Sequence, residues 1–365
     1  MSNYVEHILP PHLRKHPAVF WVGVVLIALA LAIIPFVLVA NSMTAWVRIT
    51  NFAILFVFLS LGLNIVVGFA GLLDLGYIAF YAVGAYVYAL LASPHFGLHL
   101  PFWVILPIGA MVACLFGVLL GAPTLKLRGD YLAIVTLGFG EIVRIFMNNL
   151  SEPINITNGP KGISTIDSIK LFGLDFGNTT RIGEFAMSGL IKYYYLLMLM
   201  LMVVIMINLR LQNSRIGRAW EAIREDELAA RAMGINTTSL KLLAFAMGAT
   251  FGGLAGGVFA AIQGFISPES FTLTESVMIL AMVVLGGMGN IWGVMLGAVL
   301  LSFMPEFLRY TVEPAQKWLF GRTIIEAEVL RMLIFGFAMV AMMLFRPAGL
   351  LPSAVRKREL APKAD

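Results

Sequence analysis

The sequence is poor in charge and almost free of cysteine. Asp, Glu, Lys and Arg make up 12% of the 365 residues, about half of the ~25% that is typical of soluble domains. Apolar residues make up 60%, and the mean hydropathy is +0.90. The single cysteine, Cys114, excludes a disulfide within the chain and a metal site built from several cysteines. The composition therefore indicates a polytopic membrane protein.

The motifs of common catalytic sites are missing as well. The sequence contains no GxxxxGK[ST], HExxH, GxSxG or paired-cysteine motif. Its polar segments are shorter than the roughly 50 residues that a soluble catalytic domain needs. All five histidines lie in the N-terminal tail or in one short loop: His7, His12, His16, His95 and His99. These absences exclude a P-loop ATPase and argue against a membrane-embedded enzyme.

The net charge of +5 is not a signal for nucleic acid, because the basic residues lie in short polar segments beside apolar runs. In that position they set the topology and contact anionic lipid headgroups. We expect membrane lipid as a partner and no nucleic acid.

Long apolar runs predict an all-α polytopic fold with about ten transmembrane helices, since a span needs roughly 20 apolar residues. The predicted spans are 18–40, 46–67, 75–92, 101–121, 131–150, 191–209, 239–265, 275–285, 291–308 and 328–345. They form one transmembrane domain, 18–346, between an N-terminal tail, 1–17, and a C-terminal tail, 347–365. Spans two to five and seven to ten are compatible with an inverted repeat of five spans, although local identities do not establish it.

Basic residues set the predicted orientation. Lys and Arg gather before the first span, at 126 and 128, in the loop 210–241 and in the C-terminal tail. With an even number of spans these segments share one side, which is the cytoplasm by the positive-inside rule. Both termini are then cytoplasmic. The first apolar run is longer than a signal-peptide core, so we interpret it as an uncleaved span, and cleavage near Ala40-Asn41-Ser42 stays as the alternative.

The loop 210–241 carries the densest charge in the chain. Its composition predicts a helix over 218–233, which Gly234 would end in a left-handed conformation. A polar helix between two spans suits docking of a partner. The alternative is a solvated loop whose arginines only fix the topology.

The residue pattern of this loop favours docking. Glu221-Ala222, Arg224-Glu225-Asp226-Glu227, Ala229-Ala230 and Gly234-Ile235 resemble the coupling loop of ABC importer permeases. The resemblance is closest to the larger membrane subunit of the branched-chain amino acid (Leu/Ile/Val) permease family. It extends to further motifs between 61 and 352, which are Gly62-Leu63-Asn64, Leu72-Leu73-Asp74-Leu75-Gly76, Leu127-Arg128-Gly129-Asp130-Tyr131, Asn158-Gly159-Pro160 and Gly286-Gly287-Met288-Gly289. Their order and spacing are specific to the family, and less so to the substrate.

The resemblance implies a bacterial inner-membrane importer that works by ATP-driven alternating access. Its partners would be a second permease subunit in a heterodimer, two ATP-binding subunits and a periplasmic substrate-binding protein. ATP and Mg would bind to the partner ATPase subunits, and this chain would carry no cofactor. The residues expected to couple it to the ATPase are Arg218, Glu221, Ala222, Arg224, Glu225, Asp226, Glu227, Ala230 and Gly234.

Two alternatives to a Leu, Ile and Val importer stay open. One is a permease of the same class for urea, short amides or other amino acids. The other is an ion-coupled secondary carrier, which would need buried ionisable residues near the midplane. The sequence has few of these, and a carrier leaves the charged loop unexplained.

A glycine-rich segment is the candidate translocation path or gate. Broken helices line cavities in transporters, and an acidic side chain at membrane depth is costly unless it has a function. The candidate residues are Asn64, Gly68, Gly71, Asp74 and Gly76. Asp74 falls near the predicted cytoplasmic surface, which favours capping or gating over contact with the substrate.

Three further features carry predictions. Two sets of glycines spaced by four favour close helix packing over substrate contact. They are Gly248, Gly252 and Gly256, and Gly289, Gly293 and Gly297. Glu141 and Arg144 can pair along one helix face as a structural pair, with a subunit contact as an option. The outer loop, 151–190, is long for a connector, and either contacts the binding protein through Asn158, Gly159, Pro160 and Gly162 or folds over its own subunit.

Overall fold

The computed structural model describes residues 31–39, 43–124, 127, 129–171, 173–182, 185–320, 326–346 and 348–352. The predicted N-terminal tail, most of the first predicted span, most of the C-terminal tail and the basic residues at 14, 15, 126 and 128 lie outside these ranges. Of the first predicted span, residues 31–39 are described, and they are helical.

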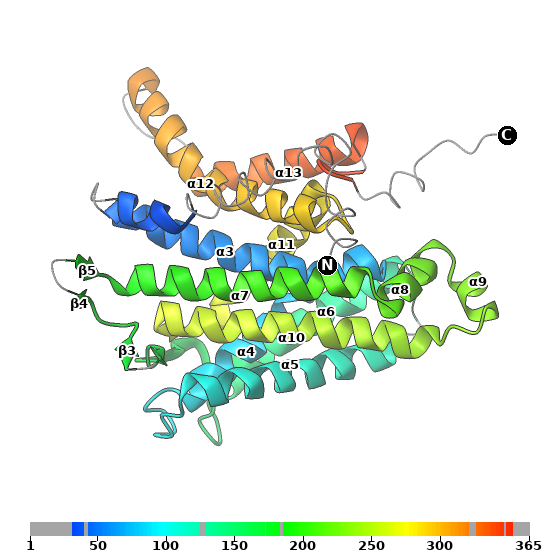
Figure 1. Ribbon diagram of the computed structural model, residues 1–365, viewed down its shortest axis with the longest axis horizontal. Helices are drawn as coiled ribbons and strands as arrows, with labels where there is room; N and C mark the ends of the chain where they lie inside the picture. Colours follow the sequence, from blue (N-terminus) through cyan, green and yellow to red (C-terminus); the bar gives the residue numbers. More distant parts are fainter. Residues whose placement is uncertain are drawn as a thin grey trace, which may run out of the picture.

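Long helices dominate the described part of the chain and lie side by side in a bundle (Figure 1). Their bounds are α3 Thr44–Asn64, α4 Ile78–Leu91, α5 Phe102–Thr124, α6 Asp130–Asn149, α7 Gly189–Gln212, α10 Thr237–Gln263, α11 Leu273–Gly286, α12 Ile291–Phe320 and α13 Ala327–Phe345. Two short helices, α8 Arg215–Glu225 and α9 Glu227–Ala232, project at one end.

Seven described segments are long and apolar enough to cross a membrane. They correspond to the predicted spans at 46–67, 101–121, 131–150, 191–209, 239–265, 275–285 and 291–308. The apolar stretches of α4, Ile78–Leu91, and of α13, Val329–Met342, are shorter. The polytopic helical fold is confirmed, whereas the count of ten and the inverted repeat stay predictions.

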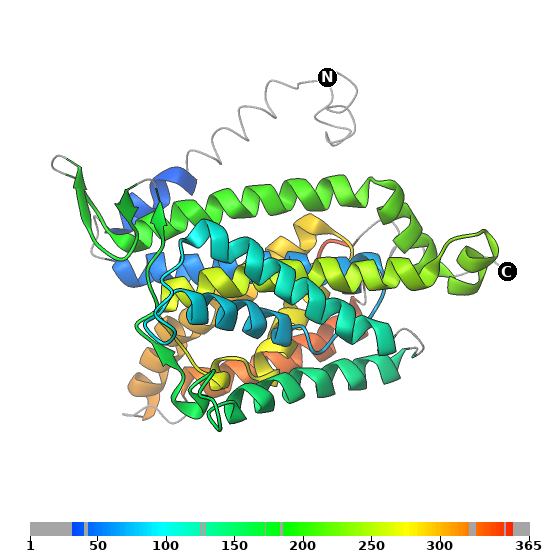
Figure 2. The same cartoon turned by 90° about the horizontal axis from the view of Figure 1, so that it is seen from below.

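Helices α3 and α10 form the centre of the bundle. Their most apolar stretches are 89% and 67% buried, against 33% for α6. Helix α10 packs along α4 and α5 on one side and α3 on the other (Figure 2). A Cβ added at Gly256 of α10 would lie 2.1 Å from the Tyr81 carbonyl oxygen of α4, so only glycine permits the two helices to approach this closely.

The outer loop and the segment after α10 contain short strands that the prediction of an all-α fold missed. Three two-stranded antiparallel sheets pair β1 (Ile163–Ser164) with β6 (Phe265–Ile266), β2 (Lys170–Leu171) with β3 (Leu174–Asp175), and β4 (Thr180–Ile182) with β5 (Phe185–Met187). They lie at the end of the bundle opposite α8 and α9 (Figure 1). Strands of two or three residues are too short to show the period-two pattern that identifies a strand in a sequence.

Candidate functional site

The charged loop folds into two helices, so the prediction of one helix over 218–233 is wrong. Helix α8 ends at Glu225, and α9 starts at Glu227. Between them Asp226 is extended, with φ −155° and ψ 108°, and its carboxylate accepts hydrogen bonds from Leu228 N (2.8 Å) and Ala229 N (3.0 Å). An aspartate that satisfies the free amides of a following helix starts that helix, and the chain changes direction there.

Helix α8 is anchored to the bundle by its inner face. Its buried residues, Gly217, Trp220 and Ile223, recur every three positions and share one face. The Trp220 indole donates a hydrogen bond to the Leu240 carbonyl of α10 (2.7 Å). Because this aromatic ring is fully buried, α8 cannot move without moving the start of α10.

The outer face of α8 and α9 is exposed and mixed in character. Arg218, Glu225 and Asp226 are exposed charges, while Leu228 and Met233 are 63% and 84% exposed. Of the other predicted coupling residues, Glu221 and Ala222 are half-buried and Ala230 is buried. Gly234 follows α9 with φ +86°, a conformation in which a Cβ is strained. Exposed apolar groups ringed by charge are typical of a docking surface.

Helix α9 is held to α10 by an ion pair. Lys241, buried in α10, lies 2.7 Å from the Glu227 carboxylate, which also pairs with Arg231 at 3.1 Å. Glu227 therefore faces the bundle, whereas the sequence placed it on the docking surface. A buried lysine needs such a partner, because an unpaired charge there is costly.

Arg224 also faces the bundle. Its Nη1 donates to the Gly68 carbonyl oxygen, and a Cβ on Gly71 would lie 2.7 Å from the Arg224 Cγ. Gly68 belongs to η1 (Ile65–Phe69), a π-helical turn that ends α3. The charged loop thus contacts the predicted gate directly, an interaction between residues 156 positions apart that the sequence could not reveal.

A cavity of about 400 Å³ lies at this contact. Its lining includes the residues 70–73, Gly129 and Leu132, and the charged residues Arg224, Glu227 and Lys241. Any shift of α8 or α9 would reshape it.

The two glycine-rich breaks in the bundle meet at Asn64. Its Oδ1 accepts a hydrogen bond from Gly289 N (2.9 Å), in the turn between α11 and α12. A Cβ on Gly68 would lie 1.9 Å from the same oxygen. Asn64 is fully buried and its amide nitrogen has no hydrogen-bond partner in the described structure. The sequence motifs at 62–76 and 286–289 therefore form one region.

After η1 the chain is irregular before α4 begins, and side chains from two other helices satisfy its backbone. Leu75 N donates to Thr136 Oγ1 of α6 (3.0 Å), and Ser276 Oγ of α11 donates to the Leu75 carbonyl (2.6 Å). Asp74 is fully buried, and its Oδ1 accepts from Gly76 N (2.9 Å). A Cβ on Gly76 would lie 2.0 Å from the Thr136 carbonyl. Asp74 here closes a local turn, as a capping residue does.

Both glycine stripes lie at helix contacts. On α10, a Cβ at Gly248 would lie 2.5 Å from Val66 Cγ2, and one at Gly252 would lie 3.1 Å from Phe80 Cβ. On α12, Gly293 and Gly297 approach the backbone of α11. The remaining member, Gly289, lies in the turn before α12 with φ +83°.

The predicted binding-protein contact is a closed turn at the opposite end of the bundle. Asn158 is left-handed, with φ +61°, and its Nδ2 donates to the Gly162 carbonyl (2.8 Å). Gly159 and Gly162 are buried, and Gly162 packs against the Ile266 carbonyl of β6. Only Pro160 of the four is exposed. The turn therefore folds over its own subunit and leaves a small outward tip.

Buried Lys192 fixes another part of the outer loop. Its Nζ donates to the Asp175 carbonyl (2.6 Å), the Asn178 carbonyl (2.8 Å) and Thr180 Oγ1 (2.5 Å). A hydrogen bond from Ser168 to the Asp175 carboxylate lowers the pKa of Asp175. In the described part of the chain no group of His, Cys, Asp and Glu has the arrangement of a metal site.

Comparison with known proteins identifies close relatives. Residues 45–343 match the family model described as branched-chain amino acid transport system / permease component. The chain is 47% identical over 319 residues to the high-affinity branched-chain amino acid transport system permease protein LivM of Salmonella typhimurium, covering 84% of this chain and 70% of that protein.

Two further relatives agree with this match. The Escherichia coli protein of the same name is also 47% identical over 319 residues, with the same coverage of 84% and 70%. A probable branched-chain amino acid transport permease protein LivM of Methanocaldococcus jannaschii is 28% identical over 256 residues, 68% of each chain. No solved structure matches the chain.

Proposed function

The chain belongs to the branched-chain amino acid transport permease family, and on that premise we propose that it is one of two dissimilar membrane subunits of an ABC importer for Leu, Ile and Val. It is a multi-pass transport protein of the inner membrane and not an enzyme, as its relatives are permeases. The second permease chain, the two ATP-binding subunits and the periplasmic binding protein belong to the proposal. ATP and Mg bind on the ATP-binding subunits.

One observation carries the proposal, namely the anchored pair of helices α8 and α9 with its exposed outer face. The inner face is fixed to α10 by Trp220, and the outer face presents Arg218, Glu225 and Met233. This arrangement suits a partner protein that pushes on the bundle. We assign the α8–α9 end to the cytoplasm, where an ATPase is located, and the end with the short strands to the periplasm.

Alternating access then has a direct mechanical route. Closure of the ATPase pair moves α8, and Arg224 transfers that movement to the Gly68 carbonyl at the end of α3. Asn64 links the same turn to Gly289, so the break before α12 moves with it. A helix end that is held by single hydrogen bonds can switch between two discrete arrangements, as a gate requires.

The outer surface of the bundle suits lipid. On α5 the exposed residues Met111, Leu115 and Leu119 are spaced by four and form one apolar stripe. In a bilayer such a stripe faces acyl chains or another apolar helix.

The first test is purification of the tagged chain from its native membrane in mild detergent. Recovery of a second hydrophobic subunit and ATP-binding subunits, with ATP-dependent uptake of leucine in vesicles when loaded binding protein is present, supports the proposal. Uptake of urea or a short amide in place of leucine would assign the chain to the alternative substrate class. Uptake driven by a proton or sodium gradient without the ATP-binding subunits would instead establish a secondary carrier.

A further inference from the structure

Three charged side chains meet near the end of α6 that lies opposite α8 and α9. Arg144 lies 3.0 Å from the Glu141 carboxylate, one turn earlier on the same helix, and its Nη1 lies 3.2 Å from Glu269 Oε1 in η3 (Pro268–Ser270). The Arg144 side chain is 26% exposed and Glu269 is 60% exposed. The cluster therefore joins α6 to the segment that precedes α11.

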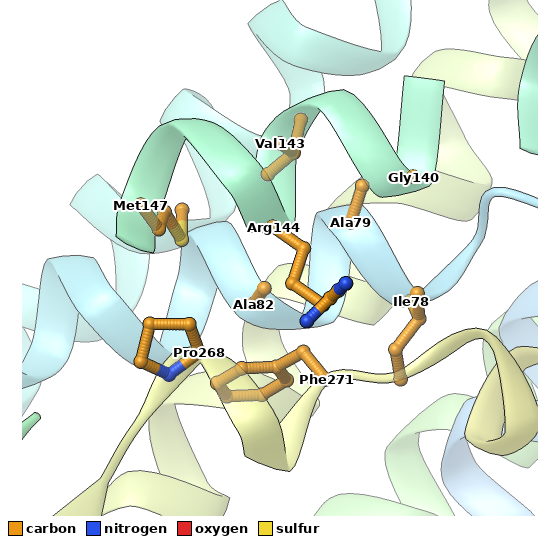
Figure 3. A pocket seen from close by; sticks show the side chains of 9 residues that line it. All are labelled: Ile78, Ala79, Ala82, Gly140, Val143, Arg144, Met147, Pro268 and Phe271. Atoms are coloured by element: carbon orange, nitrogen blue, oxygen red, sulfur yellow. The ribbon is translucent and has the colours of Figure 1, made fainter. Parts of the chain in front are cut away.

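The Arg144 guanidinium extends over an apolar crevice (Figure 3). Ile78 and Phe271 line the crevice beside the guanidinium, and the small residues Ala82 and Gly140 are also part of its lining. Arg144 is the charged residue among the nine that line this crevice. In the described conformation the crevice is too narrow for a water molecule. It is a narrow apolar pocket with Arg144 at its edge.

The crevice is connected to the gate through one stripe of α6. Thr136, Gly140 and Arg144 are spaced by four and share a helix face. Thr136 holds Leu75 N, Gly140 packs against Gly76, and Arg144 holds Glu269. The segment 70–77 and η3 therefore both contact this face of α6, beside the crevice.

The charges also constrain what this face of α6 contacts. Glu141 and Arg144 belong to a predicted membrane span, where ionisable groups avoid lipid and face the interior or a water-filled path. In the described conformation two carboxylates and one guanidinium satisfy one another. A movement of η3 away from α6 would separate Arg144 from the Glu269 carboxylate.

We propose that the crevice opens during transport, and that the Arg144 guanidinium then binds the carboxylate of a zwitterionic amino acid in transit, in place of Glu269. Glu141 receives the ammonium group, and the crevice receives the branched aliphatic side chain. Arginine suits this task because its planar fork binds a carboxylate through two parallel hydrogen bonds. The inference rests on the proposed function and assigns a substrate site within it.

Cysteine labelling in the complete complex tests the proposal. Met147 lines the crevice one turn beyond Arg144, and the only native thiol is Cys114. The reporter is therefore Met147→Cys in a Cys114→Ser background, treated with a methanethiosulfonate reagent with and without ATP. Leucine should slow the modification, and 3-methylbutylamine, which lacks the carboxylate, should not. Equal protection by the amine, no protection by leucine, or no labelling in either state would overturn the proposal.

Two substitutions that break the same ion pair separate substrate binding from a structural lock. Arg144→Gln should raise the half-protecting leucine concentration about tenfold or more, the effect of losing one charge-assisted contact. Glu269→Gln should lower that concentration, because it removes the competing carboxylate. For Arg144→Lys the half-protecting leucine concentration should lie between those of wild type and Arg144→Gln, since lysine keeps the positive charge and lacks the planar guanidinium. If Arg144→Gln and Glu269→Gln shift the half-protecting leucine concentration in the same direction, the cluster has only a structural role.

Leucine transport by the unsubstituted complex distinguishes failure of the substrate site from failure of the proposed function. A complex that imports leucine without protecting the Met147→Cys thiol refutes the site alone. A complex that imports no leucine at all refutes the proposed function. If the Arg144→Gln complex does not assemble, two results still test the substrate site. These are the comparison of leucine with 3-methylbutylamine and the direction in which Glu269→Gln shifts the half-protecting leucine concentration.

Discussion

Replacing Arg224 with Gln should uncouple ATP hydrolysis from leucine transport. The guanidinium donates to the Gly68 carbonyl in the last turn of the α3–η1 helix. Carbonyls at a helix end lack partners within the helix, and a cation there also interacts favourably with the helix dipole. Glutamine is shorter and neutral, so the contact between α8 and the gate is lost while α8 keeps its Trp220 anchor.

The size of the effect follows from the kind of hydrogen bond. Hydrogen bonds to charged groups contribute about 1.5–3 kcal/mol. Because Arg224 is half-buried, solvent screening favours the lower value, about 1.5 kcal/mol. That energy corresponds to roughly a tenfold change in the equilibrium between two gate positions. We therefore expect leucine transported per ATP hydrolysed to fall about tenfold.

The assay is reconstituted complex in proteoliposomes, with leucine uptake and ATP hydrolysis measured on the same sample. Arg215→Gln is the matched control, because Arg215 lies on the same helix and is exposed. Its ratio of leucine to ATP should stay within about twofold of wild type, as surface substitutions usually cost less than ~0.5 kcal/mol. A normal ratio for Arg224→Gln would refute the mechanical link through Gly68.

Three further substitutions test other parts of the structure. Gly256→Leu should prevent stable folding, at a cost of about 3 kcal/mol or more, because a Cβ there meets the Tyr81 carbonyl oxygen at 2.1 Å. The yield of detergent-solubilised protein measures this effect. Gly336→Ala is the control and should fold normally, because the space around Gly336 is open. Gly234→Val should reduce transport and leave membrane insertion intact, since φ +86° costs a side-chain-bearing residue about 1–2 kcal/mol; normal uptake would contradict the assigned turn. Lys192→Met should make the segment 175–180 sensitive to protease added from outside, as three hydrogen bonds are lost, and unchanged protease resistance would show that other contacts hold it.

The sequence predicted the long helices well because apolar length is a direct signal of a membrane span. It missed the break at Asp226, although the local signal was there, since aspartate before Glu-Leu-Ala-Ala is a favourable helix start. The helix-forming composition on both sides hid it.

Long-range contacts were beyond the reach of sequence patterns. The chain shows that Arg224, Asn64 and Gly289 are polar or small residues in unusual places, but not that Arg224 reaches Gly68 or that Asn64 reaches Gly289. Glu141 and Arg144 were predicted as a pair by their spacing. Their third partner, Glu269, is 125 residues away and depends on the tertiary fold.

The most direct test of the coupling role is a cross-link from the tip of α9. Met233 is 84% exposed, so Met233→Cys in the Cys114→Ser background places a single reactive thiol on the outer face of the helix pair. Photo-cross-linking from this thiol in native membranes should capture an ATP-binding subunit, with a yield that changes when ATP is added. Capture of no ATP-binding subunit, while the same membranes import leucine with ATP, would contradict the assignment of α8 and α9 as the coupling helices.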